Sequence, residues 1–148
     1  MTPIGKVYGA FLSKMLEDEW ANWTEEEIKA DLMTLLQGAI AWFKFPRVNL
    51  DIVYDDEEDE FLFKDNLTNA EIQILASFMK CEWLNRTIMT WENVKPLYEE
   101  RDFSQANLLD KFNQMLEAEK KNAEKLERIY YRSINNKPFN YGRLANNG

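Results

Sequence analysis

The side chains that most often carry out chemistry in proteins are scarce in this chain. It has no histidine, which removes the commonest general base and the commonest metal ligand. Its single cysteine, Cys81, lies in an apolar stretch without a base nearby, so a buried structural thiol is favoured over a nucleophile. Gly5, Gly9 and Gly38 fall inside predicted helices and form no phosphate-binding loop. We therefore expect the protein not to be an enzyme and to need no cofactor.

Carboxylates are the one reactive group that is abundant. Six of them are consecutive: Asp55, Asp56, Glu57, Glu58, Asp59 and Glu60. A calcium loop of the EF-hand type needs Gly at its sixth position and Glu at its twelfth, but counting from Asp55 these positions hold Glu60 and Asn66. A carboxylate-bridged metal site in a helical bundle uses Glu-x-x-His, which cannot occur here. A solvated, self-repelling loop is favoured over a calcium site, and no metal site is predicted.

The five tryptophans offer a different kind of interaction. Stacking on nucleic-acid bases would require basic neighbours, and few are present. Packing in the core and between subunits is therefore the favoured interpretation. Trp20 and Trp23 flank a predicted helix–helix turn, and we expect these two to contact another chain.

Charge is distributed unevenly along the chain, whose net charge is −8. Residues 1–119 hold 11 basic and 24 acidic side chains, a net of −13, whereas residues 120–148 hold 7 basic and 2 acidic ones, a net of +5. An acidic body with a basic C-terminal end favours head-to-tail association, or docking of this end on an acidic partner. The overall sign argues against a dedicated DNA-binding module.

Two helices are predicted at the start of the chain. Thr2, followed directly by proline, is expected to cap the first helix, which should end near Glu19. Thr24 caps the second, and Glu27 stands at the position that completes a capping box. Pro46 ends this helix, because the residue before a proline is disfavoured in the α conformation.

The connection over residues 46–66 is long and contains the acidic run. Apolar residues alternate with polar ones before this run, at Val48, Leu50, Ile52 and Tyr54, as in a half-buried strand. A small β-hairpin over residues 48–63 with an acidic tip is compatible with this pattern, and so is an extended loop. A connection of this length in a compact domain is expected to make a contact.

Two longer helices complete the predicted domain. Thr68 and Glu71 form a capping box, and the helix that follows carries two apolar stripes as far as Met89 or Trp91. A helix apolar on two sides belongs at the centre of a bundle or in a subunit contact. The last helix runs to about Ile134 with a coiled-coil-like seam.

The predicted fold is mainly all-α, a bundle of about four helices with a long C-terminal helix. Residues 1–134 form the helical domain and residues 135–148 an extended tail. The tail combines basic residues with isolated apolar anchors, and we expect it to bind a partner through Arg132, Lys137, Phe139, Tyr141, Arg143 and Leu144. No secretion signal opens the chain, and no apolar run approaches the ~18 residues of a membrane span, so a cytoplasmic protein without a membrane partner is expected.

Several segments together resemble one family. They are Phe45-Pro46-Arg47, Asp65-Asn66-Leu67-Thr68, Glu71-Ile72-Gln73-Ile74-Leu75-Ala76, Met79-Lys80-Cys81-Glu82-Trp83-Leu84, Asp102-Phe103-Ser104-Gln105-Ala106-Asn107 and Ile129-Tyr130-Tyr131-Arg132. In this helical order they resemble the head–tail connector proteins (neck or ring adaptors) of tailed bacteriophages. The resemblance covers most of residues 1–134 and includes no catalytic signature.

The resemblance implies a structural virion protein of the neck, assembled in the host cytoplasm. Its subunits would form a homo-oligomeric ring, usually a dodecamer, that contacts the portal protein on one side and another neck or tail protein on the other. DNA would pass through the lumen without sequence-specific binding, and the acidic loop would face the lumen or the tailward partner. The alternative is a monomeric acidic helical inhibitor, or DNA mimic, that acts on a host DNA-binding protein.

Overall fold

The structure of the chain is a computed structural model that describes residues 1–15, 20–94, 103–134 and 137–138. Within these ranges it is mainly helical, as predicted. The helices are α1 (Ile4–Ser13), α2 (Glu25–Trp42), α3 (Asn69–Val94) and α4 (Phe103–Tyr131). The strands are β1 (Thr2–Pro3), β2 (Ile52–Asp55), β3 (Glu60–Phe63), β4 (Ser133–Ile134) and β5 (Lys137–Pro138).

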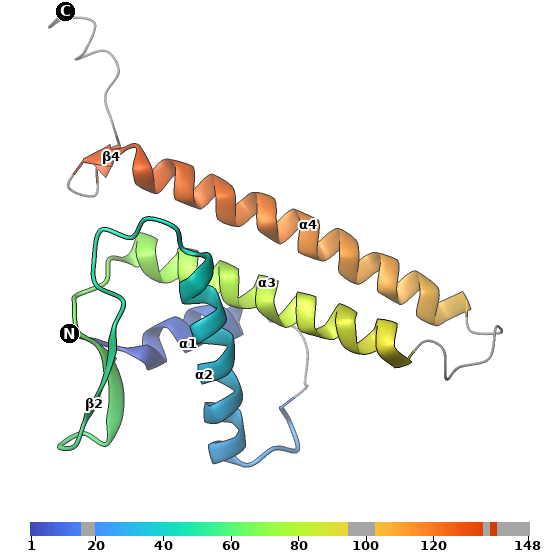
Figure 1. Cartoon of the computed structure of the whole chain (residues 1–148), viewed down its shortest axis with the longest axis horizontal. Coiled ribbons are helices and arrows are strands. Elements are labelled where there is room, and N and C mark those ends of the chain that lie inside the picture. Colours follow the sequence, from blue (N-terminus) through green and yellow to red (C-terminus); the bar gives the residue numbers. More distant parts are fainter. Residues whose placement is uncertain (16–19, 95–102, 135–136, 139–148) are drawn as a thin grey trace, which may run out of the picture.

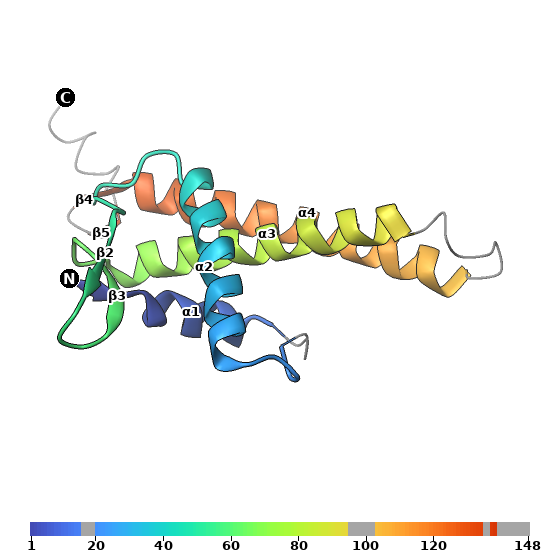
Figure 2. The same ribbon diagram turned by 60° about the horizontal axis from the view of Figure 1, so that its bottom comes forward.

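Helix α3 is the centre of the fold. It runs antiparallel to α4, which packs along it, while α1 and α2 contact α3 from another side (Figures 1 and 2). Its two apolar stripes are both used: Leu75 and Met79 are fully buried from one stripe, and Ile74 and Phe78 are buried from the other. The two-sided pattern thus correctly predicted a helix at the centre of a bundle.

The long connection between α2 and α3 forms a hairpin, the first of the two predicted alternatives, but its strands begin at Ile52 and not at Val48. Strands β2 and β3 are antiparallel, with Ile52 opposite Phe63 and Asp55 opposite Glu60. Strand β1 adds a third strand on the other side of β3, where Thr2 lies opposite Phe63. Phe63 is fully buried and anchors this small sheet to the helical core.

The predicted start and end of the first helix are both wrong. Thr2 is not its N-cap, because its hydroxyl donates to the carbonyl of Asp65 (3.1 Å) and accepts from the amide of Leu67 (2.8 Å). Pro3 is the N-cap, and no side chain caps the helix. The helix ends at Ser13, earlier than the predicted Glu19.

The caps of α2 and α3 confirm the sequence prediction. The Thr24 hydroxyl accepts a hydrogen bond from the amide of Glu27 (3.2 Å). At α3 the box is reciprocal, because the Thr68 amide donates to Glu71 (2.8 Å) and the Glu71 amide donates back to the Thr68 hydroxyl (3.3 Å). Helix α3 ends at Val94, slightly beyond the predicted boundary.

The seam between α3 and α4 contains one polar layer. Glu119 interrupts the apolar pattern of α4, and its carboxylate accepts a hydrogen bond from the Ser77 hydroxyl of α3. Lys80 lies 3.7 Å from the same carboxylate, and the Asn122 amide also donates to it (3.3 Å). The partners satisfy a half-buried charge and thereby define the register between the two helices.

The end of α4 differs from the prediction. The helix stops at Tyr131, and Ser133–Ile134 then pairs with Lys137–Pro138 in a two-stranded antiparallel ladder. Residues 137–138 of the predicted tail are therefore paired with the chain and not extended away from it. Of its predicted partner-binding residues, Phe139, Tyr141, Arg143 and Leu144 lie outside the described residues.

Candidate interaction surfaces

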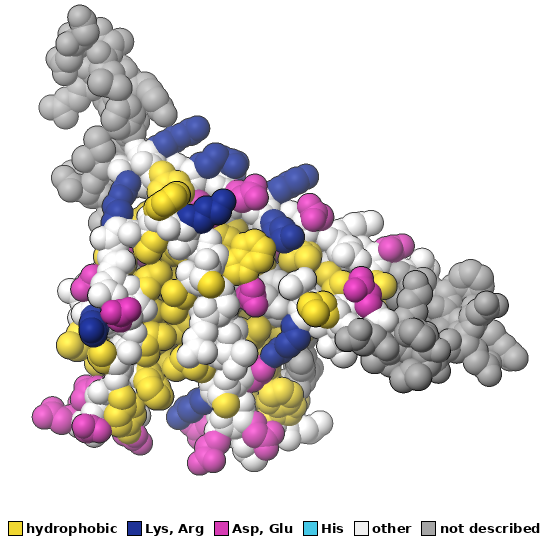
Figure 3. Space-filling view, viewed as in Figure 1, with side chains coloured by type: hydrophobic (Ala, Val, Ile, Leu, Met, Phe, Trp, Pro, Cys, Tyr) yellow, Lys and Arg dark blue, Asp and Glu magenta, His cyan; other side chains and the backbone are white. Residues whose placement is uncertain are grey.

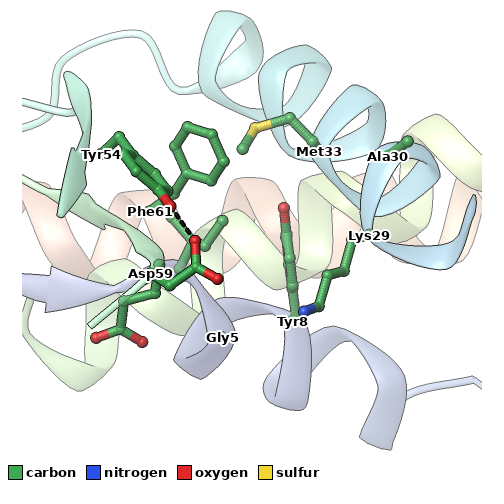
Figure 4. A pocket seen from close by; sticks show the side chains of 10 residues that line it. Gly5, Tyr8, Lys29, Ala30, Met33, Tyr54, Asp59 and Phe61 are labelled. Atoms are coloured by element: carbon green, nitrogen blue, oxygen red, sulfur yellow. Dashed lines mark hydrogen bonds between the residues drawn. The ribbon is translucent and has the colours of Figure 1, made fainter. Parts of the chain in front are cut away.

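A groove of about 520 Å³ opens between the hairpin, α1 and α2 (Figure 4). All three elements contribute to its walls, which include Ile4, Tyr8, Lys29, Met33, Tyr54 and Phe61. The hydroxyl of Tyr8 is buried and has no hydrogen-bond partner among the described residues. Burial raises the pKa of Tyr8 to about 12, so this hydroxyl remains protonated at neutral pH. The groove offers apolar contact and one free hydroxyl.

The acidic run forms the tip of the hairpin, and its carboxylates do not converge on one point. Asp55 accepts a hydrogen bond from the amide of Glu57 (3.0 Å), which stabilises the turn. Asp59 has a positive φ of 51°, which Asp tolerates better than most residues, and accepts from the Tyr54 hydroxyl. This hydrogen bond is the main cause that raises the pKa of Tyr54. Two of the six acids therefore have a structural role in the turn.

Two exposed aromatic rings accompany these acids. Tyr54 is 47% exposed and Phe61 is 43% exposed, and their ring centroids lie 5.2 Å apart. We call the segment Tyr54–Phe61 the acidic edge. Acidic side chains gather at this corner of the molecule in Figure 3.

The opposite side of the molecule is formed by the outer face of α4 and is basic. Lys121, Lys125 and Arg128 are exposed at spacings of three and four residues that align them on one face of α4, and Arg132 is exposed directly after the helix end. The exposed acids Glu117 and Glu124 lie one turn before Lys121 and Arg128, so this face is basic only in its net charge. Figure 3 shows Lys and Arg side chains following α4, with hydrophobic and some acidic side chains among them. The predicted partner-binding residue Arg132 is thus exposed at the end of this stripe.

Aromatic side chains also lie beside this basic stripe. Phe45, which follows α2, is 72% exposed and contacts the ring of Tyr131, with the centroids 6.2 Å apart. The Tyr131 hydroxyl accepts from the Phe45 amide (3.3 Å) and donates to Glu127 (2.6 Å). Burial is the largest cause that raises the pKa of Tyr131 to about 12. We call Phe45, Tyr131 and the four basic residues of the stripe the basic edge.

Arg47 links the segment after α2 to the end of α4, where the basic edge lies. This residue was not identified from the sequence as a structural one. Its guanidinium donates to the carbonyls of Tyr130 (2.8 Å) and Ser133 (2.6 Å), so it caps the C-terminal end of α4. It also lies over the Tyr130 ring, 4.6 Å from the centroid. The Tyr130 hydroxyl in turn donates to Glu71 (2.8 Å), whose side chain is almost fully buried.

The expectation that Trp20 is exposed to another chain is wrong. Trp20 is only 8% exposed, its indole nitrogen donates to Asp31 (2.8 Å), and its ring meets Phe11 edge-on. A carboxylate on the following helix satisfies the indole, so the ring can be buried. Trp23 is 37% exposed and remains open to a contact.

Among the described residues, the side chains that could react chemically are not assembled into a reactive group. Cys81 is buried, and burial raises its pKa to about 12, which suppresses the reactive thiolate. In the described ranges, no three acidic or Cys side chains are grouped so that they could hold a metal ion. Among the helices of these ranges, none is long and apolar enough to cross a membrane.

These features describe a mainly helical protein in which two pairs of exposed aromatic side chains lie at separate surfaces. No family model, curated protein or solved structure matches the chain.

Proposed function

We propose that this protein is a structural virion protein that forms an oligomeric ring between the portal and the tail of a bacteriophage. The resemblance of residues 1–134 to head–tail connector proteins, which includes the predicted helical order, supports this proposal. The ring, of twelve copies in the resembling family, lets DNA pass during packaging and ejection.

The observation that carries the proposal is the exposure of large apolar side chains at two separate surfaces. Tyr54 and Phe61 are exposed at the hairpin, and Phe45 and Tyr131 are exposed at the end of α4. Exposed apolar patches on a small domain usually mark contacts with other proteins. A subunit in a closed ring needs two different surfaces, since each copy contacts one neighbour on either side.

The charge of the chain is compatible with DNA passage. A net charge of −8 repels phosphates, so a duplex moving through the lumen would slide past the subunits without binding. This charge also suits the second candidate, a monomeric DNA mimic. The exposed basic residues of α4 favour the connector, because a DNA mimic gains nothing from a cationic face.

Virions and their assembly intermediates test this function directly. The protein is expected in purified virions by mass spectrometry, and electron microscopy should show it as a ring between portal and tail. Phage in which its gene is interrupted should accumulate heads without tails, and supplying the intact protein should restore tail attachment. Complete virions that lack the protein would contradict the proposal. Stable binding to a host DNA-binding protein, together with absence from virions, would favour the DNA mimic.

A further inference from the structure

The two exposed aromatic surfaces carry charges of opposite sign. The acidic edge holds six carboxylates in succession beside Tyr54 and Phe61. The basic edge holds three cationic side chains on one face of α4 and Arg132 just after its end, beside Phe45 and Tyr131. Each edge therefore combines a pair of contacting aromatic rings with a net charge, negative at the hairpin and positive at the end of α4.

These two edges cannot meet within a single copy of the chain. The hairpin contacts α1 and β1, whereas α4 packs along α3 on the other side of the fold. The hairpin tip and the C-terminal half of α4 lie at the same end of the molecule in both ribbon views, the tip at its lower edge and α4 at its upper edge (Figures 1 and 2). Because the helical core lies between them, each edge is available to a separate molecule.

The structure points to a second copy of this chain as the partner of each edge, and we propose that the acidic edge of one subunit docks on the basic edge of the next. This inference rests on the proposed ring and specifies which surfaces form its subunit contact. Two different surfaces that complement each other give a heterologous, head-to-tail contact, which closes into a ring when the rotation between copies allows it.

Charge and apolar contact have different parts in this interface. Complementary charges steer the two edges together and exclude the pairing of like edges, while net affinity depends more on buried apolar area. The rings of Tyr54 and Phe61 on one copy and of Phe45 and Tyr131 on the next supply this area. Aromatic side chains are enriched in the cores of such interfaces.

Charge reversal on each edge tests the contact. One variant changes Asp56, Glu57 and Glu58 to Lys, which leaves the two carboxylates that shape the turn, Asp55 and Asp59, intact. In this variant three Lys face the three remaining carboxylates Asp55, Asp59 and Glu60, so the acidic edge has no net charge to attract the basic edge. We expect its self-association to be at least about tenfold weaker than that of the wild-type chain by sedimentation velocity. The wild-type association should itself weaken as salt is raised from about 0.05 M to about 0.5 M.

The second variant changes Lys125, Arg128 and Arg132 to Glu, so that both of its edges are acidic. It should also fail to associate alone. An equimolar mixture of the two variants should form heterodimers with an affinity within about threefold of the wild-type contact, because the unaltered basic edge of the first variant meets the unaltered acidic edge of the second. The mixture thereby distinguishes a head-to-tail contact from a general effect of charge.

A matched control changes Glu26, Glu92 and Asp110 to Lys. These exposed residues lie on three different helices and belong to neither edge, and the change in net charge equals that of the first variant. Association of the control should remain within about threefold of the wild type, since isolated surface charges contribute little. Circular dichroism should show the same helical content in all variants.

Three outcomes would overturn the inference: a wild-type chain that stays monomeric at about 1 mM, a mixture that associates no better than its separate components, or a control that fails equally. If the wild type instead binds a short DNA duplex and reversal of α4 abolishes this, the basic edge is a nucleic-acid surface. If the two variants associate with each other but the protein is absent from virions, the inference stands and the connector function is refuted. If each variant alone still forms the ring in virions, the connector function stands and the proposed contact between the edges is refuted.

Discussion

Asp31 joins α2 to two other parts of the fold through a charged hydrogen-bond network. Its carboxylate accepts from the Arg86 guanidinium on α3 (3.1 Å) and from the indole of Trp20 (2.8 Å). Burial acts to raise the pKa of Asp31, but the hydrogen bonds from Arg86 and Trp20 outweigh it, so the pKa lies below its ordinary value. The side chain is 14% exposed, and the network is therefore only partly screened by water.

Replacing Asp31 by Asn should destabilise the fold at neutral pH by about 1–3 kcal/mol, because the charge-assisted hydrogen bonds are lost. A carboxyl whose pKa is lower in the folded state stabilises fully above its unfolded pKa of about 3.9, and this contribution is lost as pH falls through the folded pKa. The difference between the two proteins should therefore shrink between about pH 5 and about pH 2. Urea unfolding at a series of pH values measures it.

Asp110 provides the control for this substitution. It is exposed on α4, and Asp110→Asn should change the free energy of unfolding by less than about 0.5 kcal/mol at any of these pH values. An Asp31→Asn protein as stable as the wild type at neutral pH would show that the network contributes no net stability.

Among the elements, the C-terminal end of α4 depends on a residue from a distant connection. Arg47 donates to carbonyls at that end and stacks on Tyr130, so it ties the segment after α2 to α4. The same contact supports Phe45, two residues away, whose amide donates to Tyr131. The shape of the basic edge therefore depends on this one guanidinium.

Arg47→Ala should lower the free energy of unfolding by about 1.5–3 kcal/mol, because several hydrogen bonds to a charged donor are lost. Amide exchange should accelerate most in the last turn of α4. Arg47→Lys should rescue little, since an ammonium cannot reproduce the planar fork of donors. Lys44→Ala, at an exposed neighbour, is the matched control and should be neutral. Unchanged exchange at the end of α4 in Arg47→Ala would refute the capping role.

For the molecule as a whole, the predicted partner-binding tail is tested by truncation. Residues 135–148 carry Lys137 and Arg143 and no acidic side chain, and their apolar anchors include Phe139 and Tyr141. Burial of an aromatic or leucine side chain on a partner contributes about 1.5–3 kcal/mol, which offsets part of the entropy lost on docking.

A chain that ends at residue 134 should keep its helical content and its self-association, because both proposed edges are retained. It should no longer attach to portal-bearing heads in a co-sedimentation assay. Retained binding to such heads with unchanged affinity would show that the tail makes no contact with the portal. Loss of self-association instead would indicate that the tail, and not the edges, joins the subunits.

Local features of the sequence determined the elements that were predicted correctly. The caps at Thr24 and Thr68 act over three residues, so their geometry is encoded in a short window. The two apolar stripes of the third helix likewise predicted its central position. The hairpin was one of two readings, because alternation over a few residues is compatible with a strand and a loop alike.

Only the tertiary structure decided the contacts between distant residues. Thr2 caps no helix because its hydroxyl donates to the carbonyl of Asp65 and accepts from the amide of Leu67. These groups are close to Thr2 only in the folded chain. Trp20 is buried because α2 presents Asp31 to its indole. The uneven charge was visible in the sequence, but the opposite positions of the two edges follow from how α4 packs on α3. Such positions depend on packing between elements, which no local pattern of residues specifies.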